Sequence, residues 1–342
     1  MSASPHISRK DQHLDVVLSG RGRHALGTGF DDWRFVHEAL PDIDHAKIDL
    51  GVDFLGRRLK SPFLISAMTG GPARAEAINA RLAEAAQQLG IALAVGSQRS
   101  ALAGEDTGLD LALRRRAPDT PILANIGAAQ LTRGVGRDEA LRLMDMIDAD
   151  ALVVHLNPLQ EACQPEGDRD WWGVAAALHA LVRELGRPVI VKETGTGISA
   201  LTAQKLVAMG VAGIDVAGAG GTNWALVEGA RSDDPDHAGH AVAFADWGIP
   251  TARAIAEARN ALPSVLLIGS GGVRDGVDAA KAIRLGADIV GVAAGVLPAA
   301  TQSTEAVVSH FQTMTRQLRT ACFCVNAPSL AHLKRVPLLP AR

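Results

Sequence analysis

The sequence has few cysteines, no tyrosine and no large excess of charge. Its three cysteines, Cys163, Cys322 and Cys324, are too few for the disulfide framework of a secreted chain of 342 residues, so we expect a reducing compartment. The formal net charge is only −3. Nucleic acid and membrane surfaces usually require a clustered basic excess, so neither is expected as a main partner.

Long hydrophobic runs are also missing. No stretch approaches the roughly 18–20 apolar residues of a membrane-spanning helix, and residues 1–15 are polar, without the apolar core of a signal peptide. These features predict a cytoplasmic protein. The single residue between Cys322 and Cys324 is poor spacing for a metal site.

Hydrophobic residues make up 47% of the chain, which excludes wholesale disorder. Short aliphatic runs alternate with Ala-, Leu- and Arg-rich stretches of helical periodicity. Strands are expected at residues 63–66, 91–95, 121–125, 151–156, 188–192, 213–216, 265–269 and 289–292. Helices are expected at 75–89, 137–147, 172–185, 201–209, 251–261 and 275–285. Eight such units predict an α/β fold of the TIM (β/α)8 barrel type with parallel strands, and an open doubly wound sheet is the alternative.

Three regions are expected along the chain. Residues 1–62 form an N-terminal extension, residues 63–320 form the barrel, and residues 321–342 form a C-terminal tail that we expect to be irregular. The extension carries a cationic cluster at residues 9–13 (RKDQH). Such clusters are usually solvated arms, but an arm of this kind can also order over a diphosphate.

Polar and glycine residues follow the predicted strands, at the rim where barrels of this type carry their active sites. Gly271 and Gly272 follow the seventh strand, and Ala294 and Gly295 follow the eighth. These two loops are the common phosphate site of the fold, so a phosphate group is expected there. The alternative is that the glycines merely allow tight turns.

Two charged residues at this rim predict further chemistry. Lys192 closes the fifth strand, where burial of its charge would be costly without an anion; a structural pair with Glu193 or Glu161 is the alternative. Glu161, beyond the fourth strand, suits Mg²⁺ beside a phosphate, although it could be a solvated loop residue. Arg99 is a second candidate for binding a diphosphate.

Taken together, short segments along almost the whole chain resemble the type 2 isopentenyl-diphosphate isomerase family, which is FMN-dependent. They are residues 9–14 (RKDQHL), 67–71 (AMTGG), 96–99 (GSQR), 155–161 (HLNPLQE), 191–193 (VKE), 220–223 (GGTN), 246–251 (DWGIPT) and 270–274 (SGGVR). Each segment is short, but the ordered set is specific. The tail around Cys322 looks atypical for the family.

The resemblance implies a role for particular residues. The residues implied for FMN are Ala67, Met68, Thr69, Ser97, Asn125, Lys192, Thr222, Gly271, Gly272, Ala294 and Gly295. Those implied for the substrate are Arg9, Lys10, Ser97, Gln98, Arg99 and Gln160. Glu161 is implied for Mg²⁺, and Gln160, Lys192 and His155 are the candidate catalytic residues.

The resemblance also implies a reaction, the interconversion of isopentenyl diphosphate and dimethylallyl diphosphate by a 1,3-allylic proton shift. Reduced FMN would act as acid and base, with NADPH as reductant and Mg²⁺ on the diphosphate, in a homo-oligomer (tetramer or octamer). Another FMN-dependent TIM-barrel oxidoreductase, acting on a phosphorylated or hydroxy-acid substrate, is the alternative. A non-enzymatic barrel that binds a phosphate ligand is a further rival.

Overall fold

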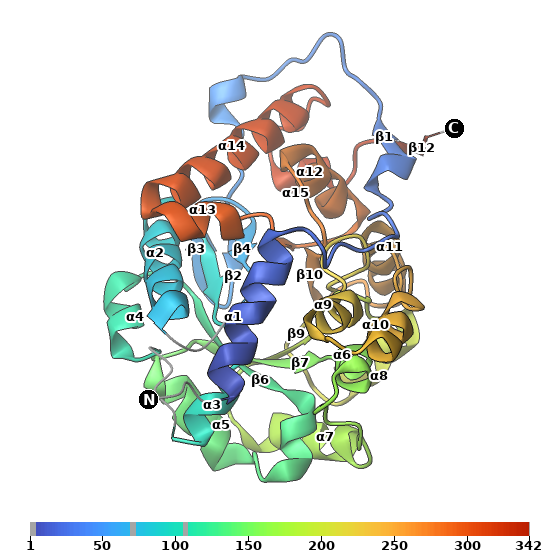
Figure 1. Cartoon of the computed structure of the whole chain (residues 1–342). Coiled ribbons are helices and arrows are strands. Elements are labelled where there is room, and N and C mark those ends of the chain that lie inside the picture. Colours follow the sequence, from blue (N-terminus) through green and yellow to red (C-terminus); the bar gives the residue numbers. More distant parts are fainter. Residues whose placement is uncertain (1–4, 69–72, 105–108, 342) are drawn as a thin grey trace.

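The structure is a computed structural model that describes residues 5–68, 73–104 and 109–341. Its centre is a closed barrel of eight parallel strands (Figure 1). In barrel order these are β4 (Phe63–Ile65), β5 (Ala92–Ala94), β6 (Ile122–Gly127), β7 (Ala151–Leu156), β8 (Val189–Glu193), β9 (Gly213–Asp215), β10 (Leu266–Ser270) and β11 (Ile289–Val292). The predicted TIM-barrel fold is confirmed, and the open sheet is excluded.

Helices surround the barrel. The main ones are α2 (Ala73–Leu89), α4 (Leu111–Arg116), α5 (Arg137–Met146), α7 (Val174–Glu184), α8 (Ala200–Ala208), α11 (Thr251–Ala261), α12 (Gly276–Leu285) and α14 (Thr304–Phe323). The strands are buried on both faces, which is why they read as short aliphatic runs in the sequence. One apolar cluster fills the barrel interior, and a larger one lies between strands and helices.

The two terminal regions are more ordered than the sequence predicted. Helix α1 (Pro5–Leu18) runs across the barrel in Figure 1 and packs on α9 (Trp224–Arg231). The hairpin β2 (Val52–Phe54) and β3 (Arg57–Leu59) places Phe54 and Leu59 against the barrel interior.

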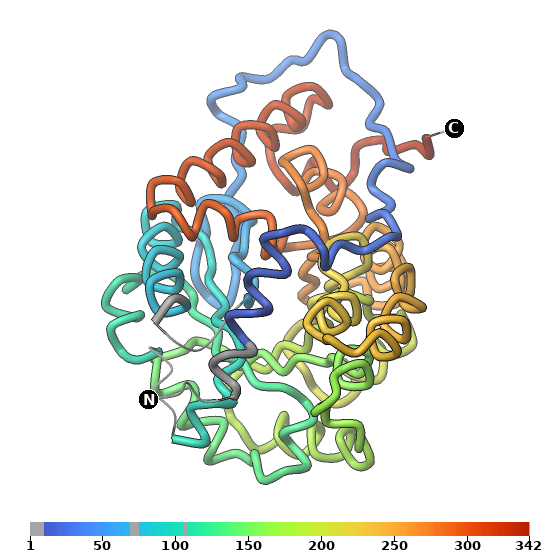
Figure 2. Tube along the Cα trace, in the orientation of Figure 1, coloured from blue at the N-terminus to red at the C-terminus, as the bar shows by residue number. Residues whose placement is uncertain are grey.

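The expected irregular tail is a wrong prediction. Helix α14 continues to Phe323, α15 (Leu330–Leu333) follows, and β12 (Leu338–Pro340) pairs antiparallel with β1 (Trp33–Phe35). Figure 2 shows these blue and red segments side by side. Pro340 lies within β12 and pairs with Trp33 in a two-stranded sheet, where both strands are edges that can hold a proline.

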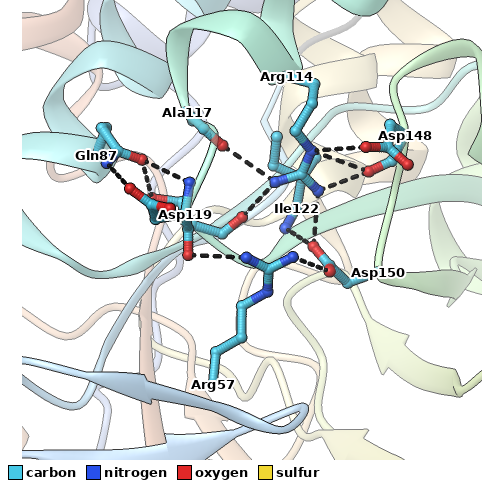
Figure 3. A network of polar contacts seen from close by, with 9 residues as sticks. Arg57, Gln87, Arg114, Ala117, Asp119, Ile122, Asp148 and Asp150 are labelled. Atoms are coloured by element: carbon cyan, nitrogen blue, oxygen red, sulfur yellow. Dashed lines mark hydrogen bonds and ion pairs between the residues drawn. The ribbon is translucent and has the colours of Figure 1, made fainter.

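An arginine and an aspartate join β6 to β7 at the amino ends of the strands (Figure 3). Asp150 makes two hydrogen bonds of 2.8 Å with Ile122: its carboxylate accepts from the Ile122 N–H, and its own N–H donates to Ile122 O. Arg114 donates to the same carboxylate at 2.7 Å and to the carbonyls of Ala117 (3.0 Å) and Thr120 (2.7 Å). We call this set the β6–β7 clasp.

The same arrangement recurs between β10 and β11. Asp288 exchanges hydrogen bonds with Leu267 (3.0 and 2.7 Å), and Arg259 donates to Asp288 at 2.7 Å. Like Arg114, Arg259 also donates to the carbonyls three and six residues further along the chain. In each clasp a second cation binds the other carboxylate oxygen, Arg57 at 2.9 Å and Lys334 at 2.5 Å.

Candidate active site

A cavity of about 300 Å³ opens at the carboxyl ends of the barrel strands, and α1 contributes to its wall. Nearly all of the predicted site residues that the structure describes line this one cavity. They are Lys10, Ala67, Met68, Ser97, Arg99, Asn125, His155, Gln160, Glu161, Lys192, Thr222, Gly271, Gly272, Ala294 and Gly295. The expected concentration of polar residues at one rim is therefore present.

Three of the predicted site residues are not in this set. Thr69 lies outside the described residues, and so does the side chain of Arg9. Gln98 is fully buried and is not in the cavity wall. Its amide accepts from Asn125 N at 3.0 Å and donates to Leu143 O at 2.9 Å. The structure therefore does not bring Gln98 to a substrate, because its polar atoms hold β6 and α5 together.

Lys192 is in the cavity wall at the end of β8, with only 8% of its surface exposed. Its ammonium group donates to the backbone carbonyl of Glu193. The Glu193 carboxylate instead accepts from the N–H groups of Thr194 and Gly195, both at 2.6 Å. Glu193 thus shapes the loop after β8, and the alternative of a Lys192–Glu193 side-chain pair is not observed.

Asp215 faces Lys192 across the β8–β9 pairing and is 2% exposed. It accepts from Ser270 Oγ at 2.5 Å and from Ala217 N at 3.2 Å. Burial raises the pKa of Asp215, and the positive charge of Lys192 opposes this rise. The sequence analysis missed Asp215, because a lone acidic residue at a strand end carries no recognisable motif.

His155 lies on β7 with its Nδ1 atom 2.7 Å from Asn125 Oδ1. Burial, and then the charge of Lys192, lowers the pKa of His155 to about 3. The imidazole is therefore neutral near neutral pH. Gly127 leaves room for the ring, since a Cβ atom there would be 3.0 Å from His155 Nε2.

A chain of hydrogen bonds crosses the cavity wall around α6 (Pro158–Cys163). Asn157 donates to Gln160 Oε1 at 3.1 Å and to Glu161 Oε1 at 2.9 Å. Glu161 Oε2 accepts from Asp168 N at 2.6 Å, and Gln160 donates to Glu228 Oε1 at 2.8 Å. These bonds fix the orientation of both predicted residues, Gln160 and Glu161.

Glu228 on α9 links this chain to α1. It is 1% exposed, and His13 Nε2 lies 3.0 Å from its Oε1. Burial raises its pKa, but the hydrogen bond and charge of His13 and the bonds from Gln160 and Arg231 lower it overall. Glu228 was missed in the sequence, because its partners come from segments far apart along the chain.

Two of the cations predicted for the diphosphate, Lys10 and Arg99, are described in the cavity wall. Lys10 on α1 lies 3.5 Å from Ser100 Oγ. Arg99, the first residue of α3 (Arg99–Leu102), lies 3.2 Å from Asp168 and has 37% of its side chain exposed. Both side chains line the cavity, where they could bind an anionic group of a ligand.

The loops after β10 and β11 present amide groups to the cavity. Within the described part of the chain, the N–H groups of Gly271, Gly272, Ala294 and Gly295 have no protein acceptor. Ser66 Oγ, buried at the end of β4, likewise has no partner there. A cavity with unpaired donors and a buried lysine fits the phosphate and ring system of FMN.

The cavity also fits Mg²⁺ at Glu161. Asn157 Oδ1 is buried without a hydrogen-bond partner and belongs to the residue that bonds Glu161. Carboxylate and amide oxygens are suitable ligands, and Mg²⁺ commonly takes one carboxylate plus substrate phosphate oxygens. Among the described residues no group of three or more His, Cys, Asp or Glu side chains could hold a metal ion.

In the described residues no helix is long and apolar enough to cross a membrane.

Comparison with solved structures supports the fold. Two mandelate oxidase structures superpose with TM-scores of 0.66 and 0.65 at 16% and 17% identity, and cover 98% and 96% of this chain and 98% and 92% of theirs. At this identity the likeness concerns the barrel alone.

Sequence comparison identifies the family. The profile of the FMN-dependent dehydrogenases matches residues 20–106 and 164–338. The isopentenyl-diphosphate delta-isomerase of Stutzerimonas stutzeri is 60% identical over 341 residues, covering 99% of both chains. Those of Xanthobacter autotrophicus and a Synechocystis species are 62% and 47% identical, covering 96% and 99% of this chain and 96% and 97% of theirs. The chain therefore belongs to the FMN-dependent dehydrogenase family and, as predicted, to the family of isopentenyl-diphosphate delta-isomerases.

Proposed function

We propose that the protein interconverts isopentenyl diphosphate and dimethylallyl diphosphate, with FMN in the cavity and Mg²⁺ at Glu161. One observation carries the proposal. Most of the described residues predicted for FMN and for the diphosphate line the same cavity, in a chain 60% identical to a named isomerase. The reaction is redox-neutral: one proton is added to the terminal alkene carbon, and one is removed from C2.

Reduced FMN would supply the proton-donating and proton-accepting group, with NADPH as the source of its electrons. The residues of the chain then bind and orient. Lys192, held by the Glu193 carbonyl, supplies positive charge to the flavin. The neutral imidazole of His155 and the amide of Gln160 would face the five-carbon chain, and neither would add a charge to the cavity.

Lys10, Ser97 and Arg99 would hold the diphosphate at the mouth, and Mg²⁺ on Glu161 would offset its negative charge. A hydroxy-acid oxidase would need a histidine base paired with an arginine on the late strands. The histidines in the described cavity wall are His13 and His155, from α1 and β7. The homo-oligomeric state and the division into three regions at residues 62 and 320 remain predictions.

The reaction is tested anaerobically with the protein, FMN, Mg²⁺, NADPH and isopentenyl diphosphate. We expect dimethylallyl diphosphate to form only when the flavin is reduced. Equal product formation with oxidised flavin, or none under either condition, would contradict the proposal.

The metal assignment is tested with Glu161→Gln. Removal of the metal-binding carboxylate should lower kcat/KM at saturating Mg²⁺ by about 100-fold or more and abolish the stimulation by Mg²⁺. Glu166→Gln is the matched control, because Glu166 is outside the cavity wall and lies 3.7 Å from Arg231. Wild-type Mg²⁺ dependence in Glu161→Gln would remove the assignment.

A further inference from the structure

The loop after β9 and the loop after β10 touch through their backbones at the edge of the cavity. Gly218 N donates to Ser270 O at 2.9 Å. A Cβ atom on Gly271 would lie 2.2 Å from Gly218 O, and one on Gly272 would lie 2.5 Å from Gly220 O. The contact between the two loops therefore requires glycine at both positions, whatever ligand the loops bind.

Thr251, the first residue of α11, lies behind this contact. It is completely buried and is not part of the cavity wall. Its hydroxyl oxygen is 2.7 Å from Gly271 O and 3.1 Å from Ala219 O, and its N–H donates to Ala219 O at 3.2 Å. A hydroxyl has one proton to donate. Ala219 O already accepts a hydrogen bond from the N–H of Thr251. We therefore assign the hydroxyl proton to the shorter contact, with Gly271 O.

This bond fixes the direction of one peptide group. The described peptide bonds are all trans, so the Gly271 carbonyl and the Gly272 N–H point in opposite directions. With the carbonyl held on Thr251, the Gly272 N–H points away from Thr251, and Gly272 itself lines the cavity. That N–H has no acceptor among the described residues.

We propose that Thr251 is a positioning residue for the phosphate group of FMN: its hydroxyl holds the Gly271–Gly272 peptide so that the Gly272 N–H faces the ligand. Thr251 does not touch the ligand itself. The inference rests on the proposed placement of the FMN phosphate between the loops after β10 and β11. It adds a residue outside the cavity that the binding of this phosphate depends on.

The test compares FMN with riboflavin, which lacks the phosphate. Dissociation constants are measured by quenching of flavin fluorescence for the wild type, Thr251→Val and Thr251→Ser. Valine has nearly the shape of threonine but cannot donate. The control is Thr304→Val. Thr304 is also the first residue of a helix and is 8% exposed, but its hydroxyl donates to Glu84 at 2.8 Å, away from the cavity.

We expect Thr251→Val to weaken FMN binding roughly tenfold, the effect of about one lost hydrogen bond, and to leave riboflavin binding unchanged. Thr251→Ser should retain FMN binding close to wild type, and Thr304→Val should not alter either ligand. Equal weakening of FMN and riboflavin in Thr251→Val would show a general structural role and overturn the inference. So would an FMN dissociation constant within twofold of wild type.

The proposed function can fail separately. If wild-type protein binds riboflavin as tightly as FMN, the phosphate site itself is wrong, and the role of Thr251 falls with it. If wild type prefers FMN but Thr251→Val keeps the full preference, only the role of Thr251 is lost.

Discussion

At the scale of single residues, the cavity combines charged groups with one histidine that stays neutral. Lys192 in the cavity wall and Asp215 beside it on the neighbouring strand are both buried, and the charge of Lys192 opposes the rise that burial causes in the pKa of Asp215. His155 adjoins Lys192 in the β7–β8 register, where a second positive charge would be repelled. The neutral state of His155 therefore follows from its neighbour as well as from burial.

This neutrality predicts a dependence of stability on pH. The pKa of His155 is about 3 in the folded protein, against the ordinary histidine pKa of 6.5 in the unfolded chain. Below pH 6.5 the unfolded chain binds a proton that the folded protein does not, so stability falls as the pH drops. Between about pH 7.5 and 5.5 this one group should lower the free energy of unfolding by about 1.4 kcal/mol.

The measurement is urea unfolding of FMN-loaded protein at the two pH values, for wild type and His155→Gln. Between the two pH values, the free energy of unfolding should fall by about 1.4 kcal/mol less in the variant than in the wild type. The other histidines of lowered pKa, His24 and His310, are present in both proteins and cancel in the difference. An identical loss in the two proteins would mean that His155 titrates normally in the fold.

At the scale of elements, α1 is the part of the site that the barrel does not provide. Leu14 is 5% exposed and lines the cavity, while His13 Nε2 lies 3.0 Å from Glu228 Oε1 and the His13 ring packs edge-on against Trp224, with 5.2 Å between the ring centroids. The residues predicted for FMN lie on the loops at the ends of the barrel strands, not on α1. The helix should therefore matter for the substrate and not for the flavin.

Leu14→Ala tests this separation. Loss of the buried side chain should weaken the docking of α1 and raise the KM for isopentenyl diphosphate several-fold, whereas the Kd for FMN should stay within twofold. Leu18→Ala is the matched control on the same helix, because Leu18 is 36% exposed. If Leu14→Ala weakened FMN binding as much as it raised KM, α1 would be part of the flavin site.

The sequence predicted some elements far better than others, for physical reasons. Barrel strands are short, aliphatic and buried on both faces, so β7 and β11 were predicted with their exact bounds. Helix α1 has a polar surface and depends on contacts with α9, which no local pattern reveals. Gln98 sits in a family motif at a strand end, yet its amide bonds the backbone, because motif position does not determine where a side chain points.

At the scale of the whole molecule, the candidate active site and the two clasps lie at opposite ends of the barrel. The cavity lies at the carboxyl ends of the strands, and the β6–β7 clasp and its counterpart between β10 and β11 lie at the amino ends. Two strands separate the clasps on either side of the closed sheet. They share no residue, and neither contributes to the cavity wall.

The two clasps should therefore act independently. Asp150→Ala and Asp288→Ala each leave an arginine and a strand N–H without their carboxylate, at a cost of about 2 kcal/mol for such partly buried groups. The double variant should lose the sum of the two within about 0.5 kcal/mol. Urea unfolding of the single and double variants measures this.

Arg253→Ala is the control for this experiment. Its partner Glu257 lies four residues away on exposed α11 surface, so it should cost less than about 0.5 kcal/mol. None of the variants should change the Kd for FMN, because both clasps lie at the far end of the barrel. A double variant that lost much less than the sum would show that opening one clasp already weakens the other through the closed sheet, so that the two clasps do not act independently.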